Sequence, residues 1–155
     1  MLPITIAESL RSNWLSGGIK INPGVSKATL QLFESKYEVM LPDDLREYFL
    51  LVNGMDIYMT DEDLIRFWSL EEVKSISEGA SEYSDQGYLP DPSSIFMFAD
   101  YCIWSHTYAI RLSSCEERND VYVIGGKSPI FLAGSFTEFV TLYLAHRCLD
   151  FLRLA

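Results

Sequence analysis

The chain lacks the features that mark several classes of protein. Its three cysteines, Cys102, Cys115 and Cys148, are an odd number and form no Cys-x-x-Cys pair. The sequence therefore predicts neither a disulfide framework nor a cysteine zinc site. No signal-like segment opens the sequence, and no apolar run approaches the roughly 20 residues that span a bilayer. We expect a cytoplasmic protein with reduced thiols and no membrane partner.

Basic residues are scarce. Twelve Lys and Arg stand against 22 Asp and Glu, which gives a formal net charge of −10. The basic residues are scattered, as Lys20, Lys27 and Lys36 illustrate. Binding to a phosphate backbone depends on clustered cations that release counterions, so we expect no nucleic-acid partner. A basic protein fits the charge better, although surplus carboxylates can also serve solubility alone.

Catalytic and metal-binding motifs are also missing. The two histidines, His106 and His146, have no second histidine or cysteine at a metal-ligand spacing. The Gly-Gly-Lys-Ser stretch at 125–128 fails as a phosphate-binding loop, because the first glycine of that motif, five positions before Gly126, is absent. His106 could act as a general base beside Asp100, but a packed imidazole is the simpler interpretation. We expect no cofactor, no metal and no enzymatic activity; an enzyme assembled from distant residues is the alternative.

The composition is that of a folded domain. Hydrophobic residues make up 48% and aromatic residues 14% of the 155 residues, which argues against intrinsic disorder. A chain of this length buries about 70% of the surface that its unfolded form exposes, so it can support a core. No repeat or linker divides the sequence, and we expect one domain over residues 1–155.

Helix start and stop signals recur along the chain. Ser26, Ser69 and Ser135 each stand where a side chain can cap a first turn, and Asn53-Gly54 can end a helix. The predicted helices cover residues 4–14, 26–40, 41–54, 70–76 and 135–149.

Strand patterns fill the remainder, apart from a long polar loop over residues 77–94. The predicted strands cover residues 57–59, 64–68, 95–99, 104–112, 121–124 and 130–132. Turns at 60–63 and 113–120 predict antiparallel hairpins. We expect an α+β fold: a single domain with a mixed, mostly antiparallel sheet of about five or six strands flanked by helices.

The order of these segments and their amino-acid sequences resemble those of the SUKH superfamily. The resemblance covers nearly the whole chain and lies in Leu41-Pro42 with Asn53-Gly54, in Phe-Trp-Ser-Leu-Glu-Glu-Val at 67–73, in Ile-Phe-x-Phe-Ala-Asp at 95–100, and in Ala-x-Ser-Phe-x-Glu-Phe at 133–139. It implies a single α+β domain and a role. Many bacterial members are immunity proteins that bind and neutralise a cognate polymorphic toxin, often a nuclease. Fungal members act as regulatory scaffolds with long disordered extensions, which this compact chain lacks, so the bacterial role is the closer match.

The negative charge is concentrated in one segment. The segment from Asp56 to Asp91 contains ten carboxylates and only two basic residues, Arg66 and Lys74, so it carries −8 of the total charge. The segment also contains aromatic residues. Its charge can attract a partner protein at long range, and its aromatic rings can anchor that partner at an interface. The predicted partner-binding residues are Asp56, Tyr58, Asp61, Glu62, Asp63, Trp68, Glu78, Glu82, Tyr83, Asp85, Tyr88 and Asp91.

This segment suggests how a toxin would be neutralised. A nuclease toxin is basic because it binds the phosphates of its substrate. We expect the acidic segment to imitate the negative charge of those phosphates and to occlude the toxin's cleft. An ordinary solvated loop is the alternative. A regulatory module that binds an endogenous protein is the second functional hypothesis, and the sequence leaves the oligomeric state open.

Overall fold

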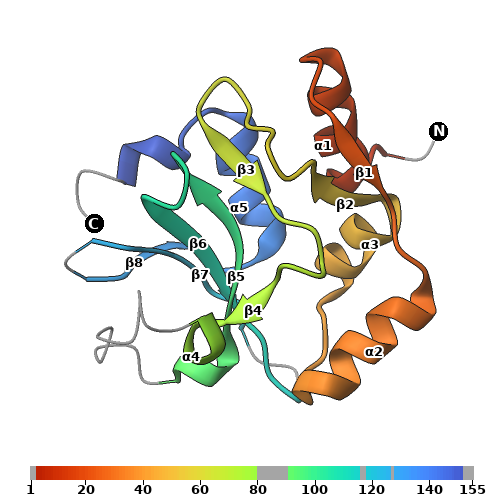
Figure 1. Ribbon diagram of the computed structural model, residues 1–155, viewed down its shortest axis with the longest axis vertical. Helices are drawn as coiled ribbons and strands as arrows, with labels where there is room; N and C mark the ends of the chain where they lie inside the picture. Colours follow the sequence, from red (N-terminus) through yellow and green to blue (C-terminus); the bar gives the residue numbers. More distant parts are fainter. Residues whose placement is uncertain (1–2, 80–90, 116–117, 127, 152–155) are drawn as a thin grey trace.

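The computed structural model describes residues 3–79, 91–115, 118–126 and 128–151 (Figure 1). Its helices are α1 (Ile6–Ser16), α2 (Lys27–Tyr37), α3 (Asp43–Leu51), α4 (Ile76–Gly79) and α5 (Phe136–Leu144), with 3-10 turns η2 (Pro92–Ser94) and η3 (Cys148–Phe151). Its strands are β1 (Ile21–Pro23), β2 (Val52–Met55), β3 (Ile65–Phe67), β4 (Lys74–Ser75), β5 (Ile95–Tyr101), β6 (His106–Arg111), β7 (Val121–Ile124) and β8 (Ile130–Ala133). None of the described helices is long and apolar enough to cross a bilayer.

The strands form a six-stranded sheet and a separate two-stranded sheet. The large sheet has the order β3-β5-β6-β7-β8, and β4 pairs with β5 as well. Because β6 pairs along the whole of β5, strands β3 and β4 share its other edge. The small sheet pairs β1 with β2, and every described pairing is antiparallel. The predicted α+β fold with a sheet of about this size is confirmed.

One face of the large sheet packs on α1, α3 and α5 through an aromatic core (Figure 1). The Phe67 ring lies at its centre, with ring centroids of Trp14 at 5.0 Å and Tyr143 at 4.9 Å. Rings at these distances and tilted angles attract one another beyond the burial of their area. This packing joins the first helix and the last helix to an edge strand of the sheet.

The other face of the sheet carries a smaller core and a row of buried polar groups. Trp68, Ile76 and Met97 belong to this second cluster. Arg66 and Asp100 lie opposite each other on β3 and β5, and both are buried. Burial of charged groups requires partners, and these two residues help to shape the surface described below.

Two of the three predicted serine caps are confirmed. The Ser26 side chain accepts a hydrogen bond from Thr29 N at 3.2 Å, and the Ser135 side chain accepts one from Glu138 N at 3.0 Å. At Ser69 the side chain does not cap a helix: Glu72 Oε2 accepts from Ser69 N at 2.9 Å and from Ser69 Oγ at 3.0 Å. The predicted helix over residues 70–76 is wrong. The chain turns instead and enters β4, because Lys74 and Ser75 pair with β5.

The third predicted helix ends earlier than its Asn-Gly signal suggested. Helix α3 ends at Leu51, and Asn53 and Gly54 lie inside β2. Asn53 Oδ1 accepts a hydrogen bond from Leu70 N at 2.7 Å, so this side chain ties β2 to the turn after β3. Gly54 has a φ of 71° and passes close to the backbone of Trp68. The glycine is needed for a close approach of two strands rather than for a helix stop.

The predicted strand over residues 57–59 and its hairpin across residues 60–63 are also wrong. Residues 57 and 58 lie in a turn in which Met59 N donates to Asp56 O at 2.9 Å. Strand β2 pairs with β1, whereas β3 pairs with β5, so the two flanking strands belong to different sheets. Local alternation could not reveal which strand each would pair with.

Two further element ends differ from prediction. Helix α5 ends at Leu144, so His146 lies beyond it with a φ of 57°. Strand β6 begins at His106, and Trp104 belongs to the turn before it. Both corrections place side chains that were expected on regular elements at one end of the sheet.

Two glycines with nearly equal φ provide a test of the close approach at β2. A Cβ added at Gly54 (φ 71°) would lie 2.4 Å from Trp68 O, whereas one added at Gly18 (φ 72°) would meet nothing within 4 Å. We expect Gly18→Ala to lower the free energy of unfolding by about 1 kcal/mol from backbone strain alone. Gly54→Ala should lower it by roughly 1–3 kcal/mol more, because a strand must move. Urea unfolding of both variants measures the difference; equal losses would contradict the close approach.

Candidate partner-binding surface

Two loops adjoin at one end of the large sheet. Residues 56–64, between β2 and β3, form one loop, and residues 102–105, between β5 and β6, form the other. We call the two loops together the tip. Cys102 N donates to Leu64 O at 2.8 Å, which continues the β3–β5 pairing into the loops. Ile57 and Trp104, one from each loop, line the same cavity. The tip is therefore one continuous surface.

Large apolar side chains are exposed on the tip. Tyr58 is 96% exposed and Ile103 is 86% exposed, while Ile57 and Trp104 are both more than half exposed. Single exposed apolar residues are common on protein surfaces, but contiguous groups of them mark interaction sites. The tip gathers four such side chains from two loops.

The backbone of the β5–β6 turn is strained. Cys102, Ile103 and Trp104 are consecutive residues with φ of 51°, 51° and 67°. A left-handed conformation costs residues other than glycine roughly 1–2 kcal/mol each, and it is least tolerated by a β-branched side chain such as that of Ile103. The fold thus holds two large apolar side chains at the surface at a cost in stability, a pattern found at functional sites.

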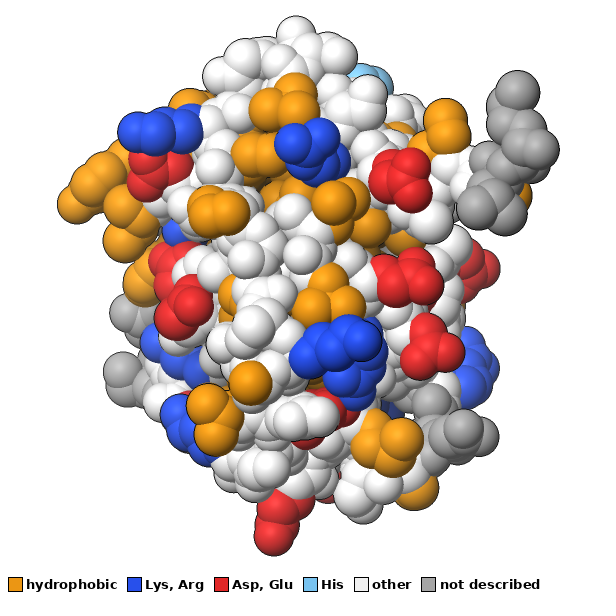
Figure 2. Space-filling view, turned by 90° about the vertical axis from the view of Figure 1, so that its right-hand side faces the viewer, with side chains coloured by type: hydrophobic (Ala, Val, Ile, Leu, Met, Phe, Trp, Pro, Cys, Tyr) orange, Lys and Arg blue, Asp and Glu red, His pale blue; other side chains and the backbone are white. Residues whose placement is uncertain are grey.

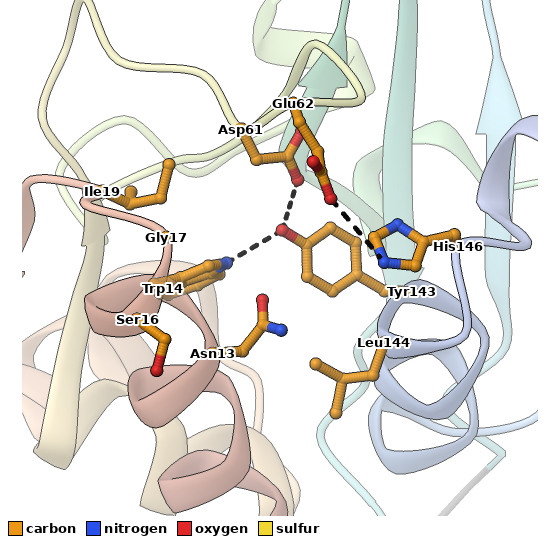
Figure 3. Close-up of a pocket in the computed structure, with 10 residues that line it drawn as sticks. All are labelled: Asn13, Trp14, Ser16, Gly17, Ile19, Asp61, Glu62, Tyr143, Leu144 and His146. Atoms are coloured by element: carbon orange, nitrogen blue, oxygen red, sulfur yellow. Dashed lines mark hydrogen bonds and ion pairs between the residues drawn. The ribbon is translucent and has the colours of Figure 1, made fainter.

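Asp61 anchors residues 56–64, which we call the acidic loop, to the helices beneath them (Figure 3). Its Oδ1 accepts hydrogen bonds from Asp63 N at 2.8 Å and from Ile65 N at 2.9 Å. Tyr143 OH donates to its Oδ2, and Trp14 Nε1 donates to Tyr143 OH at 2.8 Å. Burial raises the pKa of the Asp61 carboxyl, while these hydrogen bonds act in the opposite direction. Asp61 therefore fixes the loop to α5 and α1.

His146 holds the neighbouring carboxylates. Its Nδ1 lies 2.7 Å from Asp63 Oδ2, and its Nε2 lies 3.8 Å from Glu62 Oε1. The hydrogen bond to Asp63 is the main cause that raises the pKa of His146. Glu62 itself projects outward, with 79% of its side chain exposed. Of the acidic residues in this loop, Glu62 is the one best placed to meet a partner.

A cavity of about 310 Å³ lies beneath this loop, between the ends of α1 and α5 (Figure 3). Asn13 and Ser16 line one side of it, and Asp61, Glu62 and His146 line another. The C-terminal ends of helices carry partial negative charge, so the carbonyl groups here add to that of the carboxylates. Within the described parts of the chain, no group of three or more His, Cys, Asp and Glu residues is arranged to hold a metal ion.

A second cavity, of about 400 Å³, opens beside the tip, and we call it the tryptophan groove. The Trp68 and Trp104 rings lie 6.0 Å apart at its tip end. Trp68 Nε1 donates to Asp100 Oδ2 at 2.6 Å, and Trp104 N donates to Asp100 Oδ1 at 3.3 Å. Burial raises the pKa of Asp100. The remaining lining residues are Lys36, Tyr37, Ile57, Glu71, Glu72, Val73, Lys74, Glu78, Gly79 and Met97.

The structure divides the residues that were predicted to bind a partner. Those brought together on the tip are Asp56, Tyr58, Asp61, Glu62 and Asp63. Trp68 is buried and reaches the surface only as a wall of the groove, and Glu78 lies on α4 in the lining of the same groove. Asp91 belongs to neither, and its carboxylate lies 3.3 Å from Arg111. Glu82, Tyr83, Asp85 and Tyr88 lie outside the described residues.

Sequence reasoning missed Ile103 and Trp104 as surface residues. It placed Trp104 on a strand because Cys-Ile-Trp-Ser contains no glycine, proline or asparagine to signal a turn. It also considered His106 as a general base beside Asp100. Both oxygens of Asp100 instead accept hydrogen bonds from tryptophan N–H groups, and His106 Nδ1 lies 3.1 Å from Ser105 Oγ.

Comparison with known protein families identifies the family of the chain. The sequence profile of the SMI1/KNR4 family (SUKH-1) matches residues 24–142. The chain belongs to this family. The matched region contains both loops of the tip and the tryptophan groove, whereas α1 with Trp14 precedes it.

Family membership supports a role of the toxin-immunity or regulatory kind, exercised through protein–protein interaction. No curated protein matches the sequence of this SUKH-1 chain.

Asp61 and Glu62 are adjacent carboxylates with different roles. We expect Asp61→Asn to lower the free energy of unfolding by about 1–3 kcal/mol, because the acceptor of the Tyr143 hydroxyl is lost in a partly buried place. Glu62→Gln should change it by no more than about 0.5 kcal/mol, as an exposed substitution does. Thermal and urea unfolding measure both; equal effects would show that Asp61 does not hold the loop.

The two histidines should titrate on opposite sides of their ordinary pKa of 6.5. We expect the pKa of His146 above it, because of Asp63, and that of His106 below it, because of burial. The stabilisation by His146 should be complete below 6.5 and be lost as pH rises through its raised pKa. NMR titration of both rings measures the values. Asp63→Asn should lower the pKa of His146 and leave that of His106 unchanged; an unmoved His146 would contradict the pairing.

Proposed function

We propose that this SUKH-1 protein neutralises a cognate toxin in the cytoplasm by binding it stoichiometrically through the tip, without turnover or cofactor. The observation that carries the proposal is that the tip combines a group of carboxylates, of which Glu62 is 79% exposed, with exposed apolar side chains. Such a combination gives a protein both long-range attraction for a basic partner and contact area once the partner has arrived. Family membership supports the same class of function.

The charges of the tip favour a basic partner. Asp56, Glu62 and Asp63 contribute carboxylates there, and the local cations only partly offset them. Lys20 lies 3.3 Å from Asp56, and His146 lies beside Asp63. The helical face with α1, α2 and α3 differs, since acidic and basic side chains are interspersed over it (Figure 2). A toxin that binds nucleic acid has the complementary charge.

The same surface would serve a regulatory module that binds an endogenous basic protein. The two functions differ in the partner, so the test has to begin with its identity. We expect the chain to form a stable complex with the toxin domain encoded by the adjacent gene, and to abolish its activity at a one-to-one ratio. An inert toxin domain, or one that remains active in the complex, would remove the immunity function.

Charge reversal tests the role of the acidic loop without disturbing its anchor. We expect Glu62→Lys to lower the association rate constant with the toxin by several-fold and to weaken its dependence on salt, because attraction at long range is reduced. Glu47→Lys is the matched control, since Glu47 is exposed on α3 and the charge change is the same. Stopped-flow or surface-plasmon measurements at several salt concentrations compare the two. Equal rate constants for both variants would refute the docking site.

A further inference from the structure

Carboxylates attract a partner, but they do not by themselves hold it. We propose that the β5–β6 turn anchors the partner, and that the tryptophan groove takes a large apolar side chain which the partner presents between basic residues. This inference rests on the proposed function for the charge of the partner. It assigns the contact to Ile103, Trp104 and the groove, which lie mostly outside the acidic loop.

The groove has the size for such a side chain. Its volume of about 400 Å³ lies near the lower end of the range for ligand pockets, which is about 300–1,000 Å³. Ile57, Val73 and Met97 give it apolar walls, with the two tryptophan rings at one end. A single leucine, methionine or phenylalanine side chain with its flanking backbone fits this description. Apolar anchors that fill such pockets contribute most of the affinity in many interfaces.

The anchor is ordered before a partner arrives. The Trp104 ring leans on the Trp68 ring, and Trp68 Nε1 is held by the carboxylate of Asp100, which is only 2% exposed. The backbone N–H of Trp104 donates a hydrogen bond to the same carboxylate. A side chain fixed in this way loses little conformational freedom on binding, so more of the contact energy appears as affinity.

The charges decide which occupant suits the surface. The groove is balanced, since Glu72 lies 2.7 Å from Arg66 while Lys36 and Lys74 accompany Glu71 and Glu78. The tip beside it is negative. A second copy of this chain would bring like-charged tips together in a symmetric contact, which costs energy. The surface therefore fits a partner with an apolar centre and a basic rim, and the protein alone should be monomeric.

Substitutions in the complex test the anchor. Trp104→Ala should weaken toxin binding by about tenfold or more, mainly through faster dissociation, and Ile103→Ser should weaken it in the same way. Phe131→Ala is the matched control, because Phe131 is an aromatic residue of β8 that is 49% exposed, against 53% for Trp104. Circular dichroism and thermal unfolding verify that the variants fold. Dissociation at the wild-type rate in Trp104→Ala would overturn the proposal.

Defined peptides test the groove independently of any toxin. The probe is the peptide Lys-Gly-Lys-Phe-Lys-Gly-Lys; one control replaces Phe by Ser, and the other replaces each Lys by Glu. We expect the probe to shift the NMR signals of the Trp68 and Trp104 indole N–H groups, with a dissociation constant on the order of 1 mM. Each control should bind at least about tenfold more weakly. Equal binding of either control, or no binding of the probe, would overturn the proposal.

These results separate the anchor from the toxin-binding function. A toxin complex that Trp104→Ala leaves intact refutes the anchor and keeps the function. Discrimination among the peptides without any toxin complex refutes the function and keeps the groove. Light scattering of the protein alone completes the test: a dimer that Trp104→Ala dissociates would show that a second copy occupies the surface and would overturn the basic partner.

Discussion

A chain of hydrogen bonds from Trp14 through Tyr143 to Asp61 connects parts of the molecule that are distant in sequence. The indole donates to the tyrosine hydroxyl at 2.8 Å, and the hydroxyl donates to the carboxylate. It thereby joins the first helix, the last helix and the acidic loop. Each of these polar groups lies in or beside the aromatic core, where an unpaired group would be costly. The position of the loop between β2 and β3 depends on this series of hydrogen bonds.

The tip depends on that loop in turn. Asp61 also accepts hydrogen bonds from the backbone amides of Asp63 and Ile65, so the turn over these residues leads directly into β3. Strand β3 then positions Trp68 against Asp100 on β5, and Asp100 holds the turn that carries Trp104. One carboxylate therefore supports each loop, Asp61 the first and the buried Asp100 the second. The exposed residues of the tip are fixed by buried ones, as a surface that recognises a partner requires.

The sequence predicted well those features that depend on neighbours along the chain. Caps at Ser26 and Ser135 form because a side chain needs to reach only three residues ahead. The prediction failed where partners are distant. Residues 57–59 form no strand, and residues 70–75 form no helix, because strand pairing with β5 and β1 competes with local preference. Trp104 was misplaced for the same reason, since tertiary contacts hold its turn in a conformation that its residue types disfavour.

The sequence by itself determined the family, the α+β class, the excess of carboxylates and their concentration between Asp56 and Asp91. These are properties of composition and order, and they need no knowledge of distance. Only the tertiary structure decided which carboxylates face outward, since Asp61 is held inside while Glu62 is exposed. It alone placed Ile103 and Trp104 beside them. The reason is physical: exposure and adjacency follow from packing among residues far apart in the chain, and periodicity records only neighbours.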